Sequence, residues 1–148
     1  MSELRLSIDP LKLADEWLIQ PDMRRLWGEK LADAQLVLDD AKSALAVRQA
    51  ETDREIRESP ADYGIDKLSE ARISSAVTAD PFVQKAVEKM NKARHAVNVV
   101  QAAVDGLEHR KRALTLLCEL HGQDYYATPK MPPGIKRRRE REDVDADD

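Results

Sequence analysis

The chain of 148 residues has little of what builds sheets, disulfide frameworks or catalytic loops. Aromatic residues make up 4% of it, and it contains five glycines and a single cysteine, Cys118. One cysteine excludes an intrachain disulfide and a zinc site built from several cysteines. Because Cys118 lies in an apolar run, we expect it to pack as a small hydrophobic residue rather than to act as a reactive thiol.

Long apolar runs are also missing. No stretch of about 18 consecutive apolar residues occurs, which excludes a transmembrane helix. The N-terminus lacks the apolar region of a secretory signal peptide. We therefore expect a cytoplasmic protein with no membrane partner.

Motifs of enzymes are absent as well. The sequence has no glycine-rich phosphate loop and no Gly-x-Ser-x-Gly elbow. Glu51, Asp53, Glu55 and Glu58 form a carboxylate cluster of the kind with which helical nucleotide hydrolases hold Mg²⁺, but no matching set occurs on the other long predicted helix. We expect a protein that is not an enzyme and has no catalytic residue, metal site or cofactor.

What the sequence does contain is typical of long amphipathic helices. Hydrophobic residues, chiefly Ala, Leu and Val, make up 42% of the chain, and charged residues make up 35%. This composition predicts an all-α fold. The formal net charge is −4, so any affinity for nucleic acid must come from local basic patches.

Prolines and their neighbours mark the predicted helix boundaries. Asp9–Pro10 and Asp80–Pro81 each place a capping aspartate before a proline suited to the first helical position. Pro21 is expected to end the first helix, with Asp22 capping the next, and Gly122 to end the last. The predicted helices cover about residues 10–20, 22–58, 66–79 and 81–120, with a break over 59–64.

Apolar residues of the two long helices recur at alternating spacings of four and three, which is a heptad repeat. In the helix over 22–58 this stripe includes Trp27, Leu31, Ala34, Leu38, Ala41 and Leu45. The helix over 81–120 carries a first stripe of Ala86, Met90, Ala93, Val97, Val100, Val104, Leu107, Lys111, Leu114 and Cys118. Beside it runs a second stripe of Ala96, Val99, Ala103, Ala113, Leu117 and Leu120.

A helix with two adjacent apolar stripes needs neighbours on two sides. One neighbour can be the other long helix, folded back as an antiparallel coiled-coil-like hairpin. The two short helices are too small to cover the second stripe, so we expect a homo-oligomer. Whether the long helices pair within one chain or between chains stays open. The residues expected to support oligomerisation are Val97, Val99, Val100, Ala103, Val104, Leu107, Leu114 and Leu117.

An antiparallel hairpin would gather basic residues at one end of the rod. These candidates for nucleic-acid binding are Arg48, Arg54, Arg57, Lys67, Arg72, Lys85, Lys89 and Lys92. Only Tyr63 and Phe82 are near enough to stack on bases, and Phe82 is expected in the core. Binding should therefore follow the phosphate backbone. The alternative is a solvated face balanced by nearby glutamates: Glu51, Glu55, Glu58, Glu70 and Glu88.

The chain divides into a helical, oligomerising and nucleic-acid-binding domain over 1–122 and a tail over 123–148. The tail is too polar to offset the entropy of ordering, so we expect it to be disordered. Its basic run Lys136–Arg141 offers a further contact to nucleic acid, although the acidic end Asp143–Asp148 would screen it.

Residues 69–83 read SEARISSAVTADPFV. The pattern Glu70, Ile73, Val77, Asp80, Val83 and Ala86, with the helix layout over about 10–120, resembles the UvsY-type recombination mediators of bacteriophages. The resemblance implies a homo-oligomeric ring, a hexamer or heptamer, that binds single-stranded DNA in recombination and repair. It also implies two protein partners, a phage recombinase and the single-strand-binding protein, and a location in the host cytoplasm.

In that family, basic residues near the end of the first long helix contact DNA. The resemblance assigns this role to Arg48, Arg54 and Arg57, although the closely spaced Lys-x-Arg arrangement of the family is not reproduced here. A mediator that loads the recombinase is thus the leading hypothesis. The alternative from the same helical pattern is a coiled-coil scaffold or adaptor, such as an assembly chaperone or inhibitor, with no role in nucleic-acid binding.

Overall fold

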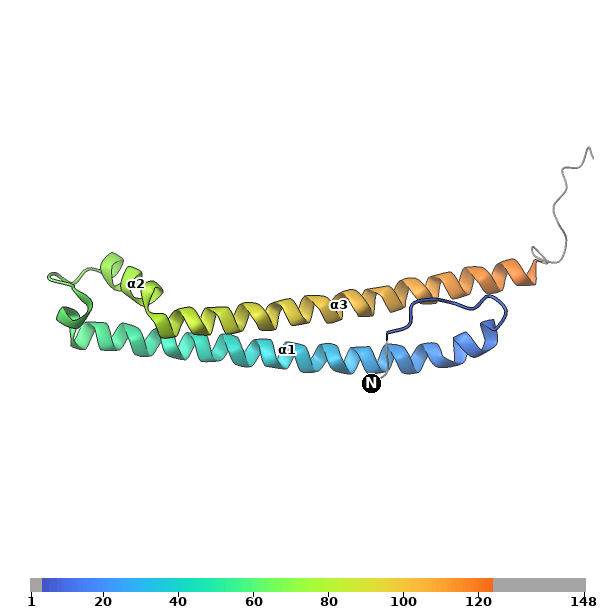
Figure 1. Cartoon of the computed structure of the whole chain (residues 1–148), viewed down its shortest axis with the longest axis horizontal. Coiled ribbons are helices and arrows are strands. Elements are labelled where there is room, and N and C mark those ends of the chain that lie inside the picture. Colours follow the sequence, from blue (N-terminus) through green and yellow to red (C-terminus); the bar gives the residue numbers. More distant parts are fainter. Residues whose placement is uncertain (1–3, 124–148) are drawn as a thin grey trace, which may run out of the picture.

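The computed structural model describes residues 4–123 of the chain and contains no strand in that range. Its elements are α1 (Leu13–Glu58), the 3₁₀ helix η1 (Pro60–Tyr63), α2 (Glu70–Ala79) and α3 (Pro81–Gly122). The two long helices lie side by side and form a thin rod, with η1 and α2 at one end (Figure 1). The predicted all-α fold class is confirmed. The tail predicted over 123–148 lies, apart from Gln123, outside the described residues.

Contacts between α1 and α3 step along the two helices in opposite directions. Trp17, near the start of α1, donates a hydrogen bond to the Sγ atom of Cys118, near the end of α3. Leu38 and Ala41 pack against Ala93 in the middle of the rod. The residues of this apolar core come from the predicted heptad stripes, because that spacing keeps one face of each helix turned to the other.

The predicted division at Pro21 is wrong, because α1 runs through this proline as one helix of 46 residues. Proline removes one backbone N–H and crowds the preceding turn, which commonly kinks a helix. Here the turn before it is held by α3, since the Gln20 side-chain amide donates to the Leu107 carbonyl at 2.8 Å. The first turns of α1 tilt toward α3 at this point (Figure 1). Asp22 therefore caps no helix.

The predicted start of α3 is confirmed, whereas the predicted starts of α1 and α2 differ from the structure. Before α3, Asp80 accepts hydrogen bonds from the backbone N–H groups of Phe82 and Val83 at 3.0 and 2.9 Å, as Asp80–Pro81 predicts. The predicted start at Asp9–Pro10 is wrong by three residues, because Asp9 instead accepts from the Leu11 N–H and closes a turn. The α2 helix starts later than predicted, at Glu70.

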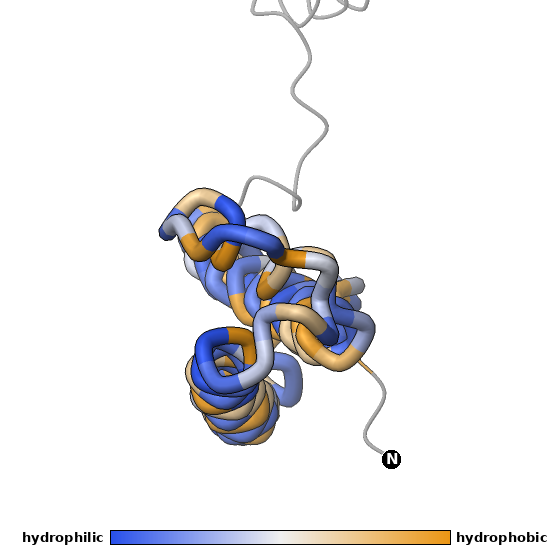
Figure 2. Tube along the Cα trace, turned by 90° about the vertical axis from the view of Figure 1, so that its left-hand side faces the viewer, coloured by the Kyte–Doolittle hydropathy of each residue, from blue (hydrophilic) through white to orange (hydrophobic). Residues whose placement is uncertain are grey.

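Residues 4–12, which we call the N-terminal strap, fold back from the start of α1 and run along α3 (Figure 1). The strap fits closely against Gly106, where an added Cβ atom would lie 3.1 Å from Cδ1 of Leu6. It is thus a neighbour within the chain for part of the second stripe, which the sequence analysis did not find. Figure 2 shows the two long helices end-on with hydrophobic residues distributed along both of them, and large hydrophobic side chains such as Leu18, Leu36 and Leu116 are exposed.

Candidate nucleic-acid interface

The end of the rod that carries η1 and α2, called here the loop end, contains the eight basic residues predicted to bind nucleic acid. A small apolar cluster of Ile56, Ile65 and Ile73 fixes the loop and α2 onto the end of α1. The side chains of Tyr63 and Val77 pack against this cluster. The cluster brings residues from α1, η1, the loop and α2 into one region.

Arg48 acts as a brace between the long helices. Its guanidinium lies 3.7 Å from Glu55 of α1 and 3.8 Å from Asp80 at the start of α3, with Glu51 at 3.6 Å. It also lies over the ring of Phe82, 4.9 Å from the centroid. Phe82 is 63% exposed, so the prediction that it fills the core is wrong. The exposed ring makes a cation–π contact with Arg48 instead.

Arg57 and Arg54 also contact carboxylates. The Arg57 guanidinium lies 2.8 Å from both Asp53 and Glu70. Arg57 donates hydrogen bonds to Glu70 and Asp53, and these bonds, with that to Glu70 the larger cause, raise the pKa of Arg57 above its ordinary value. The contact with Arg57 lowers the pKa of the Glu70 carboxyl. Arg54 lies 3.8 Å from Glu58. All three arginines that the resemblance assigns to DNA contact therefore have carboxylate partners.

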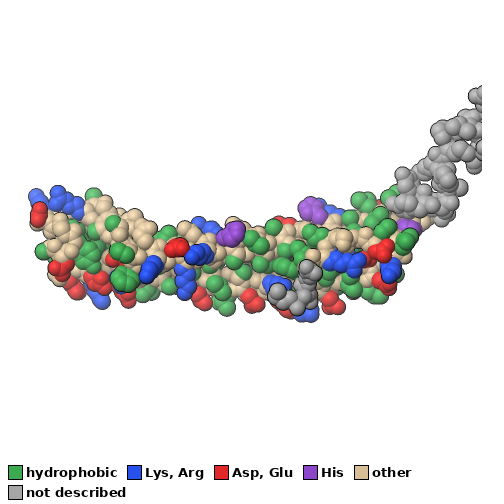
Figure 3. Space-filling view, viewed as in Figure 1, with side chains coloured by type: hydrophobic (Ala, Val, Ile, Leu, Met, Phe, Trp, Pro, Cys, Tyr) green, Lys and Arg blue, Asp and Glu red, His purple; other side chains and the backbone are tan. Residues whose placement is uncertain are grey.

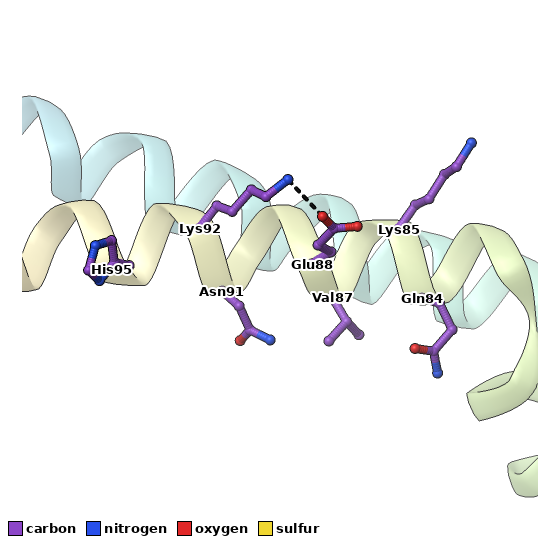
Figure 4. Close-up of a pocket in the computed structure, with 7 residues that line it drawn as sticks. All are labelled: Gln84, Lys85, Val87, Glu88, Asn91, Lys92 and His95. Carbon is purple, nitrogen blue, oxygen red and sulfur yellow. Dashed lines mark ion pairs between the residues drawn. The ribbon is translucent and has the colours of Figure 1, made fainter.

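The remaining five basic residues divide into one paired and four unpaired side chains. Lys92 forms an ion pair with Glu88 at 2.7 Å, which lowers the pKa of the Glu88 carboxyl (Figure 4). Lys85 extends away from Glu88 in the same view, along a hollow of α3 (Figure 4). Within residues 4–123, no carboxylate lies within 4 Å of the cationic groups of Lys67, Arg72, Lys85 and Lys89, and all four are exposed.

The side chains predicted to support oligomerisation differ in exposure. Four of them pack inside the single chain: Ala103, Val104, Leu107 and Leu114 are buried. Val97, Val100 and Leu117 are half-buried. Val99 is 55% exposed, so it is the member of the set that is most available to a second copy.

A buried polar group that was not predicted from the sequence joins α1, α3 and the strap. Arg110 donates to Glu16 and, at 2.5 Å, to the side-chain oxygen of Gln20. Glu16 also accepts from the backbone N–H of Asp9 at 3.0 Å and from Arg5 at 2.9 Å. The signal was weak, because the heptad places Lys111 in the first stripe, whereas Arg110 takes the buried position and Lys111 is exposed.

The predicted carboxylate cluster and Cys118 both have structural partners within the described residues. Asp53, Glu55 and Glu58 of the predicted carboxylate cluster contact arginines, and no group of three metal-binding side chains comes together within residues 4–123. Cys118 is half-buried, and its sulfur accepts from the indole N–H of Trp17 at 3.1 Å.

Charged side chains of both signs are distributed over the surface of the rod (Figure 3). The space-filling view shows Lys and Arg side chains interspersed with acidic ones along the whole rod rather than in one continuous patch (Figure 3).

No helix within residues 4–123 combines the length and hydropathy needed to cross a membrane. Comparisons with protein-family models, with curated proteins and with solved structures find no match for this chain.

Proposed function

We propose that the protein is a recombination mediator of the UvsY type. It binds single-stranded DNA as a homo-oligomer and promotes the loading of a recombinase onto strands covered by single-strand-binding protein. The observation that supports this proposal is the group of four exposed, unpaired cations at the loop end: Lys67, Arg72, Lys85 and Lys89. In a chain with a net charge of −4, such a local group is what attraction of a phosphate backbone requires.

The proposed protomer is the antiparallel helix pair within one chain. Each protomer contributes a few phosphate contacts, which are weak alone, and the oligomer makes them effective by binding one strand at several sites. Four contacts on a single strand correspond to a slope of about −3 in log K against log salt concentration per protomer. A protein of this kind positions the strand and performs no bond chemistry.

In this proposal Arg48, Arg54 and Arg57 have a different role from the one that the resemblance implies. Moving these arginines onto phosphates would break their contacts with Glu55, Glu58 and Glu70. Their partners would then lose a favourable charge interaction and would repel the strand. We therefore assign the three arginines to bracing the loop end and the four unpaired cations to the DNA.

The proposal is tested by fluorescence anisotropy with a labelled oligo-dT strand at low salt. The double variant Lys85→Ala/Lys89→Ala should bind at least tenfold more weakly than the wild type. A control with the same loss of charge is Arg25→Ala/Lys42→Ala, whose residues are paired with acids on α1 away from the loop end. The control should retain most of the affinity. If the wild type did not bind oligo-dT at low salt, the proposed mediator function would be refuted.

A second candidate is a non-enzymatic coiled-coil scaffold or adaptor. It is favoured by the pairing of Arg48, Arg54, Arg57 and Lys92 with acids, which leaves half of the predicted basic set neutralised. It is also favoured by large apolar side chains that stay exposed along the rod, such as Leu18, Leu36 and Leu116. An oligomer that does not bind oligo-dT at low salt would support this candidate.

A further inference from the structure

An open cleft lies between the loop after η1 and the outer face of α2. Its volume of about 590 Å³ is within the usual range for sites that hold small organic groups. Tyr63 and Ile65 line it from the loop, and Ala71, Arg72 and Ala76 line it from α2. We call this hollow the loop–α2 cleft. The cleft lies at the loop end, and none of the ion pairs described above occupies it.

The shape of the loop opens the cleft. Gly64 adopts the left-handed conformation, with φ of 67°, where it ends η1 and lines the cleft. A Cβ atom at Gly64 would meet nothing within 4 Å, so the space beside the turn is open. The hydroxyl of Tyr63 donates to Glu55 at 3.2 Å, and its ring packs against the isoleucine cluster. These two contacts therefore fix the position of the ring.

Charge at the cleft is arranged unevenly. Arg72 lines it, and the Arg72 guanidinium donates to the backbone carbonyl of Lys67 at 3.5 Å, next to the cleft. Neither cation has a carboxylate within 4 Å among residues 4–123. The single carboxylate of the lining residues is Asp66. An anion would thus be attracted to the side of Arg72 and repelled by Asp66.

We propose that the loop–α2 cleft holds one nucleotide of the bound strand. Its base lies against the Tyr63 ring and the side chains of Ala71 and Ala76, and its phosphate lies on Arg72. This combination of an aromatic ring and cations is how proteins hold single-stranded nucleic acid without reading its sequence. The inference rests on the proposed function and deepens it, because the sequence alone predicts contacts to the backbone only.

The test compares two labelled strands of equal length, oligo-dT and an abasic strand with the same phosphates. The full-length wild type should bind oligo-dT at least fivefold more tightly than the abasic strand. Ala71→Leu, an exposed change that fills the cleft and leaves every charge in place, should remove this preference. Tyr63→Leu should do the same, whereas Tyr63→Phe, which keeps the ring, should retain it.

Charge gives the test a second arm. Arg72→Ala should weaken binding of both strands, and Asp66→Asn should strengthen it, since the acid no longer repels the phosphate. If Tyr63→Leu loses helical content, the exposed positions Ala71 and Asp66 still decide the result. If the wild type bound both strands with equal affinity and Ala71→Leu did not change this, the nucleotide site in the cleft would be refuted. The proposed mediator function would not be refuted by that result. Failure of the wild type to bind either strand would overturn the mediator itself.

Discussion

At the scale of single residues, Arg110 is the most constrained charge in the described chain. Its side chain is fully buried, and that of Glu16 is 3% exposed. A buried charge is tolerated only when it is paired and hydrogen-bonded. Arg110 meets this condition through Glu16, Gln20 and the backbone carbonyl of Ser7. The same residue therefore joins α1, α3 and the strap.

We expect Arg110→Ala to lower the free energy of unfolding by about 3 kcal/mol, because Oε2 of Glu16 and the side-chain oxygen of Gln20 lose their buried donor, while Arg5 contacts only the other carboxylate oxygen. Urea denaturation followed by circular dichroism measures this change. The control is Arg112→Ala, an exposed arginine two residues further along α3, which should alter the free energy by less than about 0.5 kcal/mol. A loss of that small size for Arg110→Ala would show that the buried pair does not hold the helices together.

Residue roles were predictable from the sequence only where the interaction is local. The Asp80–Pro81 cap depends on neighbours two and three residues away and was predicted correctly. The partners of Arg48 and Arg57 lie partly on other elements, at Asp80 and Glu70. Which cations are paired depends on the offset between α1 and α3 and on the position of α2. A single sequence does not specify either of these.

At the scale of elements, the strap is held in place by an ionised carboxylate. The hydrogen bond from the Asp9 N–H is the main cause that lowers the pKa of Glu16 below its ordinary value of 4.5, and the cations of Arg5 and Arg110 add to it. A carboxyl group with a lowered pKa in the folded state stabilises the fold above its unfolded pKa. That contribution is lost as the pH falls through the lower, folded value.

We therefore expect the stability difference between the wild type and Glu16→Gln to depend on pH. The wild type should be more stable at pH 7, and the difference should shrink as the pH falls below 4.5. Urea denaturation of both proteins at pH 7, 5 and 3.5 measures it. Glu119→Gln on α3, at an exposed carboxylate, serves as the control and should show little dependence. A difference for Glu16→Gln that stays constant from pH 7 to 3.5 would contradict this role of Glu16.

Pro21 lies inside α1 at an exposed position, where it removes one hydrogen bond of the helix. We expect Pro21→Ala to raise the free energy of unfolding by about 1–3 kcal/mol, because alanine restores the N–H and favours the helix. Thermal or urea denaturation checks the gain. Replacing the neighbouring exposed Asp22 by Ala provides the control. A loss of stability in Pro21→Ala would indicate that packing against α3 depends on the bend at the proline.

Helix boundaries show why the proline rule failed here. Periodicity predicted the long helices correctly because it extends over many turns. The rule at Pro21 considered only the local backbone, whereas the contacts of Trp17 and Gln20 with α3 keep the preceding turns helical. The later start of α2 follows from Ser69, whose hydroxyl accepts from the Arg72 N–H and caps the helix. Long-range packing thus decided one boundary, and a local cap decided the other.

At the scale of the whole molecule, the rod is too thin to bury all of its apolar surface. The first stripe of α3 packs on α1, and the strap covers the second stripe near Gly106. Both stripes were predicted from the sequence, but the strap was not. The strap has no helical periodicity, and its docking depends on the buried Arg110. Between the strap and the loop end, Ala96 and Val99 of the second stripe remain exposed. This is the part of α3 for which a second copy is the expected neighbour.

We expect the wild type to elute as an oligomer whose mass is a multiple of 16.7 kDa when light scattering is coupled to size exclusion. The variant Ala96→Glu/Val99→Glu places two charges on the exposed stripe, so it should form smaller species with unchanged helical content. The matched control moves each glutamate one residue around the same helix, to His95→Glu/Asn98→Glu, and should keep the wild-type mass. Because weak sites act together in the oligomer, the stripe variant should also lose affinity for oligo-dT although no loop-end cation has changed. A monomeric wild type, or a stripe variant with full mass, would show that α3 does not recruit a second copy through this face.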